Sequence, residues 1–348
     1  MAVIKAVDEY ADLMRVSAAS AGNDHRLGGN EAPPAIVSIF LGDELTAVLK
    51  SIEEDTYFNE HQSVQLETGA HVLPHFMKDN TDRNRTSPFA FTGNKFEFRM
   101  LGSSASVATP NIILNTAVAE ALSQFAKELE GTAPEDMEHA VHELIKRAIK
   151  KHKKVIFNGN GYTEEWVEEA KKRGLYNLES TPDCLPQFIA DKNVELFTKH
   201  HIFTKEEIFS RYEILLENYV KTIGIEAKTM KEMLTKDFLP AVSSYAASVS
   251  DNALAMKALA PSVPTASAES LVASLGDAYE KISSTLTTLD EEIQEIDKKG
   301  SMQESADYCH KTVLATMDEL RAAADEAEAK IPDEELPYPT YDALLFSV

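Results

Sequence analysis

The chain has 348 residues, of which 43% are hydrophobic and 26% are charged. This composition excludes a disordered or fibrous protein and is enough for two domains of ordinary size. The 34 Lys and Arg residues against 57 Asp and Glu residues give a formal net charge of −23, which repels phosphate backbones and anionic lipids, so we expect neither nucleic acid nor a membrane as a partner.

Hydropathy and cysteine usage favour a cytoplasmic protein. The longest strongly apolar run, Ala35 to Leu41, is far shorter than the roughly 20 residues that a bilayer span requires. The first residues lack the apolar region and cleavage site of a signal peptide. Cys184 and Cys309 are 125 positions apart and form neither a disulfide framework nor a metal-binding pair, which predicts free thiols in a reducing compartment.

The chain is predicted to begin inside a helix. Apolar residues recur at helical spacing from Val3 to Met14, with no capping residue ahead of them. A helix without a cap leaves the N–H groups of its first turn unsatisfied. This is common at true termini and is also what a truncation would produce, so both interpretations stay open.

The region before residue 132 is rich in Gly, Pro and Asn turns and carries short strands. Strands are predicted over Ala35–Leu41 and Lys95–Arg99. In the second strand charged and apolar residues alternate, so that Glu97 and Arg99 share one face while two Phe side chains share the other. Helices are expected over residues 43–54 and from Thr109 onward.

A change in composition near residues 131–134 predicts a boundary between a domain of residues 1–132 and a helical domain of residues 133–348. In the helical part, apolar residues recur every three or four positions over 271–296 and 306–327, which predicts a long antiparallel hairpin at about 265–330. The predicted fold class is therefore α+β, with antiparallel strands and helices followed by a mostly helical domain. Further helices are expected over 137–151, from Thr163 and over 205–220, and the tail over 332–348 is expected to pack on a neighbouring surface.

Several polar residues of the first region could form a site for an anionic ligand. Arg26 and Glu31 lie five positions apart on a Gly-rich turn that two prolines close, and Arg83 and Arg85 flank Asn84. Arginine suits forked recognition of phosphate or carboxylate oxygens. A carboxylate at Glu97 could hold Mg²⁺ beside Arg99. Several arginines and a metal-binding carboxylate are the groups that phosphoryl transfer requires.

Simpler interpretations stand beside this one. Arg83 and Arg85 could be solvated ion-pair partners on an acidic protein, and Glu97 could be the wet face of a half-buried strand. The pair His139 and His142 beside Glu143 has metal-compatible spacing but lacks further ligands in the sequence. Structural or surface roles are expected for the remaining histidines considered, His71, His75, His200 and His201. Residues 159–161 form a turn rather than a phosphate loop.

Two long strings of residues resemble type III glutamine synthetase. They are residues 19–34, ASAGNDHRLGGNEAPP, and residues 82–99, DRNRTSPFAFTGNKFEFR. The segments NGYTEEW at 160–166 and PYPTY at 337–341 resemble the same class, so the likeness covers essentially the whole chain.

The resemblance implies ATP-dependent ligation of ammonia to glutamate through a γ-glutamyl phosphate, in a Mg²⁺- or Mn²⁺-dependent site of a ring-based homo-oligomer. It implies the following roles: Arg26 and Arg99 bind glutamate, Glu31 shields the intermediate and takes a proton from ammonium, Arg85 stabilises the transferred phosphoryl group, Glu97 ligates the metal, and Lys95, where the family has arginine, contacts the nucleotide. The family also has an arginine where this chain reads Pro88-Phe89-Ala90.

The amino-terminal half of that family, with its β-grasp domain and most of its metal ligands, has no counterpart in these 348 residues. The resemblance therefore implies the carboxy-terminal part of such an enzyme, inactive alone and dependent on the missing half or on full-length subunits. A multi-metal site needs several carboxylates, which supports this expectation. The alternative is a non-catalytic helical assembly module.

Overall fold

The computed structural model describes residues 1–29, 31–58, 65–66, 76–77 and 87–346. The described chain divides into two compact units, residues 1–215 and 216–348, and the division falls inside helix α9 (Lys205–Met233). No helix in the described ranges combines the length and apolar character needed to cross a bilayer.

The first unit contains short strands among helices. Its strands are β1 (Ile39–Phe40), β2 (Gln65–Leu66), β3 (Phe76–Met77), β4 (Phe89–Phe91) and β5 (Phe96–Phe98). Its helices are α1 (Ala2–Val16), α2 (Ala21–Asp24), α3 (Gly42–Glu54), α4 (Ala108–Leu129), α5 (Met137–His152), α6 (Glu164–Lys172), α7 (Thr181–Cys184) and α8 (Asp191–Lys199), with short 3-10 turns over Lys153–Val155 and Leu185–Ile189.

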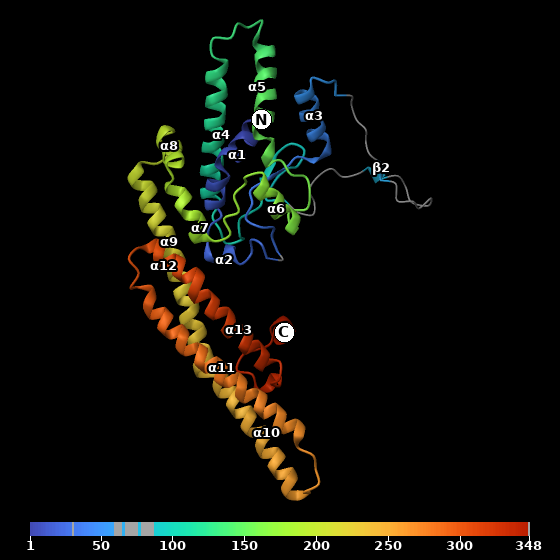
Figure 1. Cartoon of the computed structure of the whole chain (residues 1–348), viewed down its shortest axis with the longest axis vertical. Coiled ribbons are helices and arrows are strands. Elements are labelled where there is room, and N and C mark those ends of the chain that lie inside the picture. The colour runs from blue at the N-terminus through green and yellow to red at the C-terminus, as the bar shows by residue number, and fades with distance from the viewer. Residues whose placement is uncertain (30, 59–64, 67–75, 78–86, 347–348) are drawn as a thin grey trace. The chain divides into compact units, whose positions relative to one another are not determined.

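Helix α1 is the centre of this unit. It packs against α4, α5 and α7, and Leu13 and Met14 are fully buried. Figure 1 shows α4 and α5 as long neighbouring helices. As the sequence predicts, α1 begins at the start of the chain, and its N-cap Met1 makes no side-chain capping bond.

The sheet that supports the candidate site has the strand order β1-β4-β5, with β1 and β4 parallel and β4 and β5 antiparallel. Strand β5 lies within the predicted range, and its two phenylalanine side chains pack on Phe89 of β4. The predicted strand over 35–41 is shorter in the structure, because only Ile39 and Phe40 pair with β4. Residues 35–38 are buried but follow the two prolines without joining the described sheet.

The second unit is helical. Its elements are the last part of α9, α10 (Leu239–Leu259), α11 (Ala266–Ile296), α12 (Met302–Tyr308), α13 (Leu314–Glu328) and α14 (Tyr341–Phe346). One π-helical turn at Leu234–Phe238 connects α9 to α10, another at Cys309–Val313 connects α12 to α13, and a 3-10 turn covers Asp333–Glu335. Helix α11 contacts α10 and α13.

The apolar positions that the sequence spaces at three or four residues are largely buried in this unit. The fully buried ones include Leu275, Ile282 and Leu289 on α11, and Leu320 and Ala327 on α13. The regular spacing places these side chains on one stripe of each helix. Their burial explains the long apolar pattern without a cofactor.

The packing does not break at the predicted boundary between residues 132 and 133. Helix α5, which follows that position, packs on α1, α3 and α4, so residues 133–215 belong to the first compact unit. The prediction that residue 132 separates the end of a catalytic domain from a helical extension is a statement about function, which the packing does not test.

Both cysteines are free and buried. Burial raises the pKa of the Cys184 thiol to about 12 and that of Cys309 to about 11. The thiols are therefore protonated and unreactive at neutral pH.

Candidate functional site

A polar cavity of about 390 Å³ opens in the first unit and collects most of the predicted site residues. Three segments and the Tyr162 side chain line it. The lining residues are Arg26, Leu27, Glu31, Ala32, Pro33, Ser87, Pro88, Glu97, Arg99, Met100, Leu101 and Tyr162. Four of the predicted residues, Arg26, Glu31, Glu97 and Arg99, thus share one cavity. Arg85 lies outside the described residues, as do Arg83, His71 and His75.

Backbone carbonyls hold the Arg26 guanidinium in place. Its Nη2 donates hydrogen bonds to the carbonyl oxygens of Arg99 at 3.3 Å and of Leu101 at 2.9 Å. Its Nε lies 3.7 Å from Oε1 of Glu31. Its Nη1 is buried and has no hydrogen-bond partner within the described part of the chain. The Arg26 guanidinium is thus fixed at the cavity wall, and a fixed guanidinium suits a ligand carboxylate.

The loop that carries Glu31 closes on itself. Gly28 has a φ of +82°, a conformation that favours glycine. Its N–H donates to the carbonyl oxygens of Ala32 at 3.2 Å and Pro33 at 3.1 Å. The Glu31 side chain is 78% exposed, so its carboxylate is accessible to a ligand from solvent.

Strand β5 places the Glu97 carboxylate at the cavity, where two cationic side chains offset its charge. Oε2 of Glu97 accepts hydrogen bonds from Nη2 of Arg99 at 2.9 Å and from its Nε at 3.2 Å. Lys95 Nζ lies 3.3 Å from Oε1 of Glu97, and Thr92 Oγ1 donates to the same oxygen at 3.3 Å. The hydrogen bonds from Arg99 and Lys95 lower the pKa of Glu97, which keeps it ionised at neutral pH. Lys95 therefore contacts Glu97, although it does not line the cavity.

Buried polar contacts fix the loop that leads to Arg26. Asn23 donates from Nδ2 to the carbonyl oxygens of Ala18 at 2.7 Å and Met100 at 2.9 Å. Asp24 accepts from Arg15 Nη2 at 2.9 Å and from the backbone N–H of Thr181 at 2.7 Å. The Arg15 side chain is only 1% exposed. Burial raises the pKa of Asp24 and the Arg15 charge opposes that shift. This network holds α2 against α1 and α7.

Sequence reasoning missed Asn23, Asp24 and Tyr162 as parts of the site. The first two belong to the string that carries the resemblance, but nothing in their spacing indicates buried partners. Tyr162 stands next to the Gly-rich turn of residues 159–161, and its hydroxyl donates to the carbonyl oxygen of Glu31 at 3.1 Å. The distance of 131 residues in sequence leaves no local signal for that contact.

Three of the described histidines, His142, His152 and His200, lie within hydrogen-bond distance of a carboxylate. His142 Nε2 lies 3.4 Å from Asp55, and His200 Nε2 lies 2.6 Å from Glu120. Burial alone would raise the pKa of Glu120, but hydrogen bonds from Lys199, Gln124 and His200 lower it to about 2. No group of three or more His, Cys, Asp and Glu side chains with the arrangement of a metal site occurs among the residues that the structure describes.

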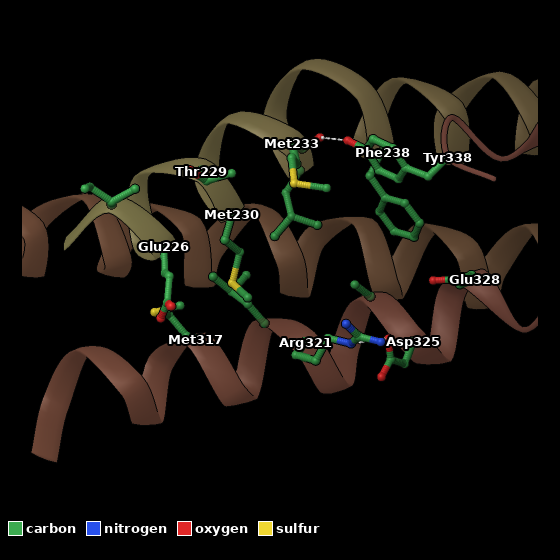
Figure 2. A pocket seen from close by; sticks show the side chains of 14 residues that line it. Glu226, Thr229, Met230, Met233, Phe238, Met317, Arg321, Asp325, Glu328 and Tyr338 are labelled. Carbon is green, nitrogen blue, oxygen red and sulfur yellow. Dashed lines mark hydrogen bonds and ion pairs between the residues drawn. The ribbon is translucent and has the colours of Figure 1, made fainter. Parts of the chain in front are cut away.

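A second cavity, of about 490 Å³, lies in the second unit between α9 and α13. Figure 2 shows its methionine and phenylalanine side chains, including Met230, Met233, Met317 and Phe238. The Tyr338 hydroxyl donates to the Met233 carbonyl oxygen at 3.1 Å. This cavity is mostly apolar and contains none of the predicted site residues.

Comparison with known proteins agrees with the resemblance. Residues 140–257 match the glutamine synthetase C-terminal domain. The chain is 48% identical to a glutamine synthetase of Butyrivibrio fibrisolvens, in an alignment that covers 100% of this chain and 49% of that protein. It is 39% identical to a type-3 glutamine synthetase of Dictyostelium discoideum, over 99% of this chain and 48% of the relative. A glutamine synthetase of Bacteroides fragilis is 34% identical, over 99% and 49% respectively. The chain thus spans about half the length of the curated relatives that it matches.

Proposed function

We infer that this chain, which belongs to the glutamine synthetase family, supplies part of the active site for ATP-dependent ligation of glutamate and ammonia. The observation that carries the proposal is the shared cavity of Arg26, Glu31, Glu97 and Arg99. Two guanidinium groups and two carboxylates in one cavity suit a substrate with carboxylates and an ammonium ion. The function proposed is glutamine synthesis through a γ-glutamyl phosphate.

Arg26 and Arg99 bind the glutamate carboxylates in this proposal. The Nη1 of Arg26 is the buried donor without a described partner, and a substrate carboxylate oxygen would satisfy it. Arg99 holds Glu97 through two of its nitrogens, which fixes the plane of its guanidinium. Both guanidinium groups are therefore oriented before the substrate arrives.

The phosphoryl-transfer groups are Arg85, Lys95 and Glu97. A γ-carboxylate oxygen of glutamate attacks the terminal phosphorus of ATP, and ADP leaves. Arg85 and Lys95 would neutralise charge on the transferred group and the nucleotide. Glu97 would be suited to bind Mg²⁺ or Mn²⁺, because its ionised carboxylate supplies oxygen ligands at the cavity wall. The metal supplies charge neutralisation at the phosphates.

Glu31 acts in the second half of the reaction. Its exposed carboxylate accepts a proton from ammonium, and the resulting ammonia attacks the γ-carbonyl carbon. Phosphate then leaves with the electrons of the carbon–oxygen bond and takes up the extra proton of the nitrogen, which gives the neutral amide. Arg26, 3.7 Å from the Glu31 carboxylate, helps to keep that carboxylate beside the bound glutamate.

Residues 1–132 would be the end of the catalytic domain, and residues 133–348, with the helical hairpin at about 265–330, the extension. Only Glu31 and Glu97 are acidic among the described residues that line the cavity. A site that holds several metal ions needs more carboxylates, so we propose that further ligands come from the amino-terminal half or from full-length subunits of a ring-based oligomer.

An assay of ADP release tests this division. The 348-residue chain alone is expected to release no ADP in response to glutamate and ammonium, whereas the same chain joined to an amino-terminal half is expected to do so. Release by the chain alone that depends on both substrates would contradict the dependence on that half. No release by the joined protein would contradict the ligase function.

A role in assembly is the second candidate, and the second unit favours it. The apolar cavity there lies beside a tail with exposed apolar side chains, namely Leu344, Leu345 and Phe346, which are 59%, 75% and 78% exposed. Sedimentation of the chain with and without residues 341–348 tests this role. A loss of self-association in the shortened chain would support it, and unchanged monomeric behaviour of both would contradict it.

A further inference from the structure

We propose that Tyr162 is a positioning residue that holds Glu31 at the cavity through its phenolic hydroxyl. Only the functional consequence of this inference rests on the proposed ligase function. The contact joins two segments that are far apart in sequence, the end of the loop that carries Glu31 and the turn before α6.

The contact is made by the polar tip of a side chain that is not part of the core. Tyr162 is 38% exposed, its hydroxyl donates to the Glu31 carbonyl oxygen at 3.1 Å, and it lines the same cavity as Arg26 and Arg99. Most of its surface is nevertheless covered, so ring packing and the hydrogen bond both contribute to its placement. The hydrogen bond is the feature that ties this tyrosine to the site.

The segment that carries Tyr162 is rigid. The Tyr162 N–H donates to Oδ1 of Asn160 at 3.0 Å, and Thr163 caps α6 by accepting from the N–H of Trp166. The Trp166 ring is 2% exposed and stacks on Phe157 with 3.7 Å between ring centroids. A capped helix anchored by the buried Trp166 and the partly buried Phe157 holds the hydroxyl in place.

The same core also fixes the exit of the Glu31 loop. Ile36, which is 1% exposed, belongs to the buried cluster that contains Trp166 and Ala170. The loop thus leaves Glu31, passes two prolines and enters the core on which α6 is built. Tyr162 and the loop exit are therefore attached to one support.

The Glu31 side chain has little to hold it by itself. Its carboxylate is 78% exposed and 3.7 Å from the Arg26 Nε, and an ion pair of that exposure constrains geometry weakly. Gly28 gives the loop a conformationally permissive residue near its start. A hydrogen bond to the backbone of Glu31 from a rigid neighbour is thus the contact that orients the residue.

Hydrogen exchange of the chain tests this without any assay of ligation. The N–H of Gly28 reports on the loop, because it is bonded to the carbonyl oxygens of Ala32 and Pro33 across it. Tyr162→Phe removes only the hydroxyl, and we expect exchange at Gly28 to become about 2- to 10-fold faster. Tyr162→Ala is expected to give the same increase. Tyr176→Phe, in which Tyr176 is 46% exposed, is the matched control and is expected to match the unmodified chain.

Two outcomes would overturn the proposal. In the first, Tyr162→Phe exchanges like the unmodified chain. In the second, the Gly28 N–H exchanges faster in Tyr162→Ala but at the unmodified rate in Tyr162→Phe. That result would assign the effect to ring packing rather than to the hydroxyl.

The ligase reaction of the chain joined to an amino-terminal half adds a second measurement. Tyr162→Phe is expected to lower kcat about 2- to 10-fold, with a smaller change in the KM for glutamate, because Arg26 and Arg99 remain in place. Faster exchange in a joined protein that has no ligase activity would sustain the positioning role and reject the ligase function. Unchanged exchange and unchanged kcat in an active enzyme would reject only the positioning role.

Discussion

The two cavities of this protein differ in how the backbone forms them. The polar cavity of residues 1–215 is built from a loop, the residues just before β4, the end of β5 with the residues that follow it, and one tyrosine. The apolar cavity of residues 216–348 is lined largely by two long helices. Irregular backbone brings charges from distant segments together and leaves carbonyls free to anchor Arg26. Regular helices repeat apolar side chains along one face. The proposed ligand chemistry therefore lies in the first unit, whereas apolar packing dominates the second.

The sharpest test of that division is Arg26→Lys in the chain joined to an amino-terminal half. Lysine keeps the charge but loses the forked donors that bind two carbonyls and a carboxylate together. We expect kcat/KM for glutamate to fall about 10²- to 10³-fold, the range seen when one preorganised donor to a reacting group is lost. Steady-state kinetics measure this. Arg147→Lys, on an arginine that is 63% exposed, is the control, and a change at position 26 no larger than the control would reject the role of Arg26.

The complementary test is Leu320→Ala in the apolar unit. Leu320 is fully buried and lines the second cavity, so we expect the free energy of unfolding to fall by about 2–5 kcal/mol. Urea denaturation of the chain measures this. Leu254→Ala, at a position 66% exposed on α10, should change stability by less than about 0.5 kcal/mol. Equal effects at the two positions would show that the cavity wall is not part of the core.

A pH titration separates structural charges from those of the candidate site. The pKa of Glu120 is about 2 instead of its usual 4.5, so its hydrogen bonds stabilise the folded chain above pH 4.5. That contribution is lost as the pH falls from about 4.5 toward 2. Unfolding measured across this range is expected to show a smaller loss of stability in Glu120→Gln than in the unmodified chain. Parallel curves for the two proteins would contradict the assignment.

The smallest expected effect is that of Glu31→Gln on stability. Because Glu31 is 78% exposed, the change should alter the free energy of unfolding by less than about 0.5 kcal/mol. Thermal denaturation measures this, with Leu320→Ala as the destabilised reference. A loss comparable to that of Leu320→Ala would mean that Glu31 supports the fold rather than the proposed chemistry.

Periodicity located the helices but not all of their ends. Helix α9 runs from Lys205 to Met233 where a helix over 205–220 was predicted, and α4 begins at Ala108 without a side-chain cap. Thr163 caps α6 as expected, and the apolar positions of α11 and α13 are largely buried. The strand over 35–41 was wrong in length, because strand length depends on a partner elsewhere in the chain. The partner here is β4, which begins at Phe89 and pairs with Ile39 and Phe40 alone among the residues of the predicted strand.

The candidate site was predictable only in part. Residue chemistry and the resemblance selected Arg26, Glu31, Glu97 and Arg99, which the structure brings to one cavity. The contact of Tyr162 with Glu31 and that of Asp24 with Thr181 join positions more than 130 residues apart. Such contacts follow from tertiary packing, and no local pattern encodes them.

The buried Nη1 of Arg26 sets stability against function. A buried donor without a partner, as Nη1 is within the described residues, costs about 1–3 kcal/mol. Arg26→Met would relieve that cost but would leave the carbonyl oxygens of Arg99 and Leu101 without their donor. A carboxylate ligand would relieve the cost at Nη1 too, which makes thermal stabilisation by glutamate a direct measure of occupancy.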